Sequence, residues 1–184
     1  MLADKLKQLK IALAEAQDLG RAAAVLEGDQ HAYMPPGGAA GRAEQLATLY
    51  KLAHQKATAA RLGRLLDDLK KQRRRADPDS DDASLARVAA RDYKRATKVP
   101  AKLVAEIARA TTLAQAHWVK ARAEKNFSLF LPSLERIFDL QRQVAACFGR
   151  QASPYDPLLD QYEPGMKSAQ VRQVFADLRR ELDA

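Results

Sequence analysis

The sequence contains little cysteine and no long apolar run. Cys147 is the one cysteine among 184 residues, so no disulfide can form within the chain. No segment approaches the ~20 apolar residues that cross a bilayer, and the opening MLADKLKQLK lacks the apolar segment of a signal peptide. These absences exclude a disulfide-stabilised secreted domain and a membrane-spanning protein, and we expect a cytoplasmic protein.

Aromatic residues are also scarce, at 6% of the chain, although 47% of it is hydrophobic. The apolar positions are mostly Ala and Leu, which predicts a core of helices that approach closely on small side chains. A length of 184 residues matches one domain, which we place at residues 1–184. The net charge is +8, and the excess of basic residues lies in the first two-thirds of the chain. Such an excess could bind nucleic acid, bind an acidic partner, or serve solubility alone.

Apolar residues recur at helical spacing along almost the whole chain, whereas the alternation typical of strands is missing. Leu2, Leu6, Leu9 and Leu13, for example, are spaced by four, three and four positions. We therefore predict an all-α fold of about six helices with long antiparallel helical hairpins.

The predicted boundaries follow from caps, prolines and glycines. The first helix is expected to end before Leu26, and the second to run over 40–75 with a bend at Gly63. The others are a helix over 80–98 capped by Asp79 or Ser80, one started by Pro100, one beginning near 128–132, and a last one capped by Ser168. The spacing also places several large side chains on inward faces: Val88, Trp118, Phe138, Val174, Phe175, Leu178 and Leu182.

The residues that could perform chemistry do not form a recognisable catalytic motif. His31, His54 and His117 lie in different segments, and no H-E-x-x-H pair places two metal ligands on one helix face. Cys147 lies in the apolar stretch VAACF and is interpreted as a buried small hydrophobe. The glycine-rich PPGGAAG follows no strand, so it is interpreted as a helix connection rather than a phosphate loop. We predict no catalytic residue and no metal ligand within this chain.

A basic cluster leaves a second interpretation open. It comprises Lys70, Lys71, Arg73, Arg74 and Arg75, which a duplex nucleic acid could bind through its phosphates. An acidic helix start follows directly and accounts for the cluster by helix-dipole complementarity. Aromatic residues that would stack on bases are not interleaved with the basic ones, so nucleic-acid binding is the alternative and not the leading hypothesis.

Two segments together resemble one known family. GDQHAYMPPGGAAGRAEQ resembles the W-D-x-x-T-x-M-P…G-x-x-x-R-x-x-Q signature of the carboxypeptidase Taq family of zinc-dependent metallocarboxypeptidases, with matches at Asp29, Pro35, Gly38, Arg42 and Gln45. Gly28 replaces the Trp of that signature, and Ala32 replaces its Thr. YDPLLDQYEPGM resembles a second segment of the same family, with matches at Tyr155, Asp156, Asp160, Tyr162, Glu163, Pro164 and Gly165. From the residues alone, the acids of this segment are interpreted as caps of short helical turns.

The resemblance covers nearly the whole chain but only the N-terminal helical region of the family. It implies a divalent metal such as zinc, bound by an H-E-x-x-H helix that lies beyond the end of this sequence. We therefore expect the chain to be inactive alone, with no cofactor of its own, and its motif residues to be structural or to line a groove. The expected partners are a second copy, a separate catalytic chain as in a split enzyme, or a peptide, and no membrane is expected.

Overall fold

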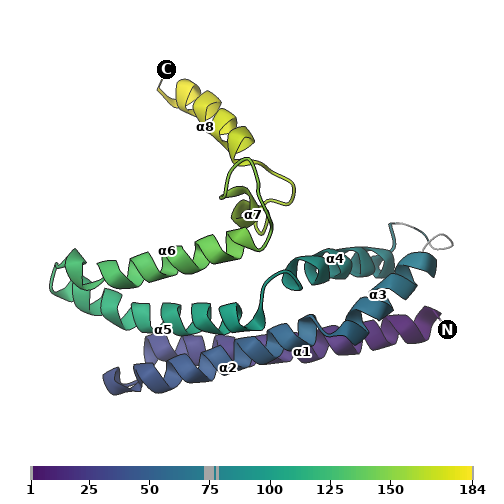
Figure 1. The fold of residues 1–184 in the computed structure, drawn as a ribbon, viewed down its shortest axis with the longest axis horizontal. Helices are drawn as coiled ribbons and strands as arrows, with labels where there is room; N and C mark the ends of the chain where they lie inside the picture. The colour runs from purple at the N-terminus through teal and green to yellow at the C-terminus, as the bar shows by residue number, and fades with distance from the viewer. Residues whose placement is uncertain (1, 73–76, 78, 184) are drawn as a thin grey trace. The chain divides into compact units, whose positions relative to one another are not determined.

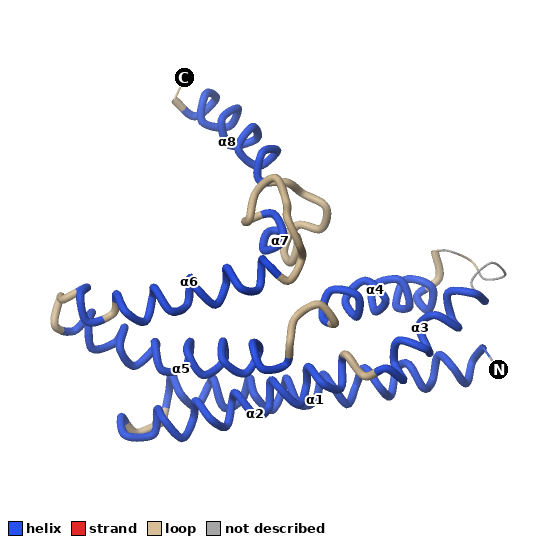
Figure 2. Tube along the Cα trace, in the orientation of Figure 1, coloured by secondary structure: helices blue, strands red, loops and turns tan. Residues whose placement is uncertain are grey.

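The computed structural model describes residues 2–72, 77 and 79–183, and within those ranges every regular element is a helix (Figures 1 and 2). The prediction of an all-α fold is confirmed. The elements are α1 (Leu2–Ala32), η1 (Pro36–Gly38), α2 (Ala39–Ala57), α3 (Ala60–Gln72), α4 (Asp81–Ala96), α5 (Ala101–Ala123), η3 (Phe127–Leu129), α6 (Leu131–Ala146), α7 (Asp156–Leu159) and α8 (Ser168–Leu182).

The chain divides into two compact units, Met1–Arg136 and Ile137–Ala184. The first holds α1 to α5 and the start of α6, and the second holds the rest of α6 with α7 and α8. The prediction that residues 1–184 form one domain stays a prediction.

The first unit is built on a long antiparallel hairpin, in which α2 and then α3 run back along α1. Three ion pairs show the antiparallel direction: as the residue number of the partner on α1 decreases, that of the partner on α2 or α3 increases. The contacts are Arg42–Asp29 near the turn, Lys56–Glu15 further along, and Lys5–Asp68 near the N-terminus. Helix α2 also runs antiparallel to α5, with Glu44 paired to Arg109 and His54 in contact with Val99, just before α5.

Two predicted boundaries of this hairpin were wrong. The first helix does not end before Leu26 but continues through Ala32, so Asp29 is a helical residue. The second pattern is interrupted at Thr58 and Ala59, not at Gly63. At that break the carbonyl oxygen of His54 accepts hydrogen bonds from both the backbone nitrogen and the hydroxyl of Thr58, at 2.9 and 2.7 Å.

Two helix starts match the sequence patterns. Ser80 has extended backbone angles, and its hydroxyl accepts a hydrogen bond from the nitrogen of Ala83, so the prediction of a cap at Asp79 or Ser80 is confirmed at Ser80. Pro100 occupies the position just before α5, where its missing N–H costs no helical hydrogen bond.

The core of the first unit is built from Leu and Ala, as the composition predicts. One cluster joins α1, α3 and α4, and its buried members are Leu9, Leu62, Leu65, Leu66, Leu69 and Ala89. Between α1, α2 and α5 the buried side chains are again small or aliphatic, among them Ala23, Ala43, Leu46 and Ala114. Small side chains let the helix axes approach closely and position the polar residues between them.

Several apolar residues predicted to face inward are exposed: Val88, Trp118, Phe138, Val174, Phe175, Leu178 and Leu182. Trp118 is partly covered by the Arg122 guanidinium, which lies 5.3 Å from its ring centroid. The exposed residues of α8 form an apolar face, with 63% of Phe175 and 76% of Leu182 accessible. Helical periodicity identified this face, but no described residue buries it.

Candidate functional site

The residues of the first family-like motif meet at the closed end of the α1–α2 hairpin. Arg42 lies on α2, one turn after the connection, and 11% of its side chain is exposed. Its Nη2 donates a hydrogen bond to Asp29 Oδ2 at 2.5 Å, and its Nε donates to Gln45 Oε1 at 3.1 Å. Its Nη1 donates to the backbone oxygen of Leu26. A mostly buried guanidinium thus has three acceptors.

The connection itself explains two further motif positions. Pro35 is extended and precedes the 3-10 turn Pro36–Gly38, where the nitrogen of Gly38 donates to the Pro35 oxygen at 2.8 Å. A Cβ on Gly38 would lie 2.8 Å from Met34 Cγ. A larger residue at position 38 would therefore force the Met34 side chain to shift.

A second polar pair beside this motif was missed by the sequence reasoning. Tyr50 of α2 donates its hydroxyl to Glu27 Oε1 of α1 at 2.8 Å. Burial, together with the hydrogen bond and charge of Glu27, raises the pKa of Tyr50 to about 12. The sequence did contain a hint of this pair: Tyr50, which has a hydroxyl to hydrogen-bond, lies about two helical turns after Arg42.

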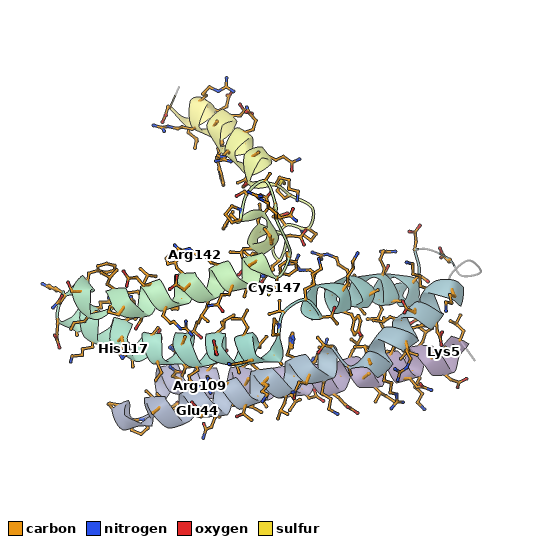
Figure 3. The ribbon with its side chains drawn as sticks, in the orientation of Figure 1. Lys5, Glu44, Arg109, His117, Arg142 and Cys147 are labelled. Atoms are coloured by element: carbon orange, nitrogen blue, oxygen red, sulfur yellow. The ribbon has the colours of Figure 1, made fainter. Side chains whose placement is uncertain are left out.

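The hairpin end is tied to α5 by other side chains. Gln30 Nε2 donates to the backbone oxygen of Thr112 at 3.1 Å, and Glu44 and Arg109 form a two-point ion pair with contacts of 2.5 and 2.7 Å. Figure 3 shows this pair between α2 and α5. The hydrogen bond from Arg109 lowers the pKa of Glu44. These contacts hold three helices together, and they contain no nucleophile beside a base.

The second family-like motif surrounds the start of α8. Asp156, only 4% exposed, accepts a hydrogen bond from the backbone nitrogen of Ser168 at 2.9 Å. The hydrogen bonds from Ser168, with the charges of Lys167 and Arg172, lower the pKa of Asp156. Ser168 was predicted to cap this helix, and that prediction was wrong: Ser168 is the first helical residue, and the distant Asp156 satisfies its N–H.

The rest of this motif forms a turn with an exposed surface. Asp160 Oδ1 accepts a hydrogen bond from the nitrogen of Gly165 at 2.8 Å. Gly165 has a φ of +87°, a conformation that favours glycine. The side chains of Tyr155, Tyr162, Glu163 and Pro164 are exposed. Asp156 and Asp160 thus act as backbone acceptors in turns, and groove lining by either motif stays a prediction.

Only two residues of the basic cluster lie within the described part of the chain. Lys70 and Lys71 are exposed on the last turn of α3. Arg73, Arg74 and Arg75 lie outside the described residues, so the nucleic-acid hypothesis stays a prediction.

The described part of the chain holds no group of three or more His, Cys, Asp or Glu side chains that could bind a metal ion. Each histidine contacts a different protein group: His31 contacts Gln115, His54 contacts the Val99 carbonyl, and His117 contacts the Ser133 hydroxyl. Figure 3 labels His117, near the end of α5. Cys147 is half-buried rather than buried, and its thiol lies 3.3 Å from the Gln143 carbonyl oxygen. The described residues therefore do not fit the zinc site that the resemblance implies. No described helix is long and apolar enough to cross a membrane.

An all-helical chain with both motifs in these positions points to the metallopeptidases suggested by the sequence. The chain belongs to the carboxypeptidase Taq (M32) metallopeptidase family, which matches residues 8–184. It is similar to thermostable carboxypeptidase 1 of Thermus thermophilus, with 35% identity over 163 residues, covering 84% of this chain and 32% of that protein. Thermostable carboxypeptidase 1 of Pyrococcus furiosus is 28% identical over 179 residues, which are 97% of this chain and 35% of that protein.

Solved structures agree with this membership. The crystal structure of BsuCP matches 96% of this chain with a TM-score of 0.89 and 26% identity, and the match covers 35% of that chain. The M32 carboxypeptidase of Deinococcus radiodurans R1 matches 96% with a TM-score of 0.71 and 34% identity, again over 35% of its own length. The predicted resemblance is confirmed. The chain spans about a third of the length of the relatives it matches.

Proposed function

We propose that this chain supplies the N-terminal helical region of an M32 carboxypeptidase fold and has no peptidase activity alone. Its role is that of a cytoplasmic helical module that binds a peptide or protein, associates with a separate chain carrying the catalytic region, or self-associates. The proposal rests on the family match over residues 8–184, together with alignments that cover only about a third of each relative.

Two features of the chain support the absence of independent activity. The 184 residues contain no H-E-x-x-H pair, which in zinc peptidases supplies two ligands and the general base. The polar clusters described above are bonded to one another and to backbone groups, an arrangement that stabilises helices rather than presenting an acid–base pair to a substrate.

Association with a larger chain is supported by the apolar face of α8. Val174, Phe175, Leu178 and Leu182 are exposed together on one helix. Contiguous apolar surface of this kind is typical of an interaction site.

The test is an assay of the purified 184-residue chain with added zinc or cobalt, on a blocked peptide whose C-terminal residue can be released. We expect no release above the metal-only blank. The catalytic two-thirds of the Thermus relative, produced as a separate chain, is then added, and we expect a complex that elutes as one species. Release of C-terminal residues by the chain alone would contradict the proposed inactivity, and failure of the two chains to associate would contradict the proposed complex with a separate catalytic chain.

A further inference from the structure

The N-terminal part of α1 and the helices α3 and α4 enclose a groove that the family-like motifs do not use. Its volume is about 810 Å³, within the range of ligand sites. The floor is apolar, with Leu6 from α1, Leu66 and Leu69 from α3, and Ala86 and Ala90 from α4. These residues belong to the cluster around Leu9 or pack against it, so a rigid core supports the groove.

Cations outnumber acids along the rim of this groove. Arg64 and Lys70 line it from α3, and Arg87, Arg91 and Lys94 line it from α4. The α4 cations follow one another by four and then three positions, a spacing that places them on one helix face. Of the two acids in the lining, Asp67 and Asp82, the latter is paired with Lys10 at 2.9 Å. The groove therefore presents an apolar floor beside a row of positive charge.

The shape of the groove favours an elongated occupant. Along α4 its lining extends from the N-cap Ser80 to the C-cap Thr97, which at ~1.5 Å per residue is about 25 Å. The lining of α4 includes Ala83, Ala86 and Ala90, three small residues that let another helix approach closely. A helix of four to five turns has this length, and helix-in-groove binding places its apolar face on such a floor.

We propose that this groove binds an acidic amphipathic helix of a partner protein, with its apolar face on the Ala and Leu floor and its carboxylates against the cations of α3 and α4. The proposal rests on the proposed function as a protein-binding module and names the partner's chemistry. A second copy is a poorer fit, because the chain carries a net charge of +8 and α8 has more Arg than acidic residues. Nucleic acid is also a poorer fit, because an apolar floor offers nothing to phosphates.

The test measures fluorescence anisotropy of a labelled helical peptide of about 16 residues with Leu on one face and Glu on the other. The comparison probes are a scrambled peptide of the same composition, a peptide with Lys in place of Glu, and a duplex oligonucleotide. The charge-reversal variant is R64E/K70E/K94E. Its matched control is K51E/K102E, which reverses exposed charges on α2 and α5. A third variant, A90W, fills the floor without changing charge.

We expect the acidic helix to bind and the scrambled and Lys peptides to bind at least about tenfold more weakly. R64E/K70E/K94E and A90W should each lose about tenfold in affinity, with helical circular dichroism unchanged, whereas K51E/K102E should change it by less than about twofold. Equal binding of the scrambled peptide, no binding at about 100 µM peptide, or an oligonucleotide that binds more tightly and is lost in the same variants would overturn the proposal. A chain that fails here but still associates with the catalytic region would leave the proposed function intact.

Discussion

Asp156 is the buried acidic residue among the described residues of the second unit, and its carboxylate accepts a hydrogen bond from the first N–H of α8. A capping side chain normally comes from the residue just before the helix. Here the acceptor for the N–H of Ser168 comes from twelve positions earlier. The negative charge lies near the positive end of the α8 dipole, which agrees with the lowered pKa of Asp156. One side chain therefore links α7 to α8.

The lowered pKa makes a pH-dependent prediction. Because the folded-state pKa of Asp156 is below its ordinary value of 3.8, its charge stabilises the fold above that value, and the stabilisation is lost as pH falls through the folded pKa. We expect D156N to melt a few degrees below the parent at about pH 7, and the difference to shrink as pH falls below 3.8.

Thermal melts followed by circular dichroism test this, with D92N on the exposed surface of α4 as the control that should not differ. A constant difference between D156N and the parent across the pH range would argue that the charge of Asp156 has no role.

Arg42 and Gly38 show how far single motif positions could be interpreted from sequence. The motif named both residues together with Asp29, and the contacts of all three explain why those residue types occur there. Glu27 and Tyr50 could not be predicted as a pair, because their contact depends on the register of two helices, which no local pattern specifies.

At the scale of helices, periodicity predicted where helices form better than where they end. Gly63 suggested a bend, but α3 passes through it without interruption. The actual break, at Thr58 and Ala59, carries no glycine or proline, so the residue types that usually mark a break gave no signal there.

Gly63 serves instead as the contact point between α3 and α4. A Cβ there would lie 2.4 Å from Tyr93 Oη and 2.7 Å from Cζ. G63A should therefore displace the Tyr93 ring, and the overpacking should exceed the ~1 kcal/mol gain in helix propensity. We expect a net loss of about 1 kcal/mol in the free energy of unfolding.

A double-mutant cycle tests whether contact with Tyr93 causes the loss of stability in G63A. In a Y93A background the clash is gone, so G63A should stabilise the chain by up to about 1 kcal/mol. Urea unfolding of the four proteins provides the measurement. A destabilising effect of equal size in both backgrounds would show that the Gly63–Tyr93 contact is not the cause.

At the scale of the whole molecule, the apolar face of α8 is the feature on which we base the proposal of association. Its residues were predicted from periodicity to be buried, yet Phe175 and Leu182 are largely exposed. The sequence pattern predicts that one face of the helix is apolar, but it does not predict which surface covers that face. The relatives extend well beyond the matched region, which supplies candidates for such a cover.

In the absence of another cover, we expect the chain to self-associate through this face at micromolar concentrations. The variant F175E/L178E introduces charges that would have to be buried in the contact, so it should sediment as a monomer where the parent does not. V25E, at an exposed apolar residue of α1, is the control and should behave like the parent. A parent chain that remains a compact monomer over the whole concentration range would rule out this contact.

The register of the α1–α2–α3 hairpin also bears on the order in which the first unit can assemble. Its cross-helix ion pairs span progressively longer stretches of chain, from 13 residues for Asp29–Arg42 to 63 for Lys5–Asp68. Because the entropy of loop closure grows with the logarithm of loop length, forming the outer pair first would cost about 1.4 kcal/mol more than forming the inner one. The closed end around Arg42 thus has the lowest loop-closure cost in this hairpin. Folding that starts there can extend along α1 toward the N-terminus.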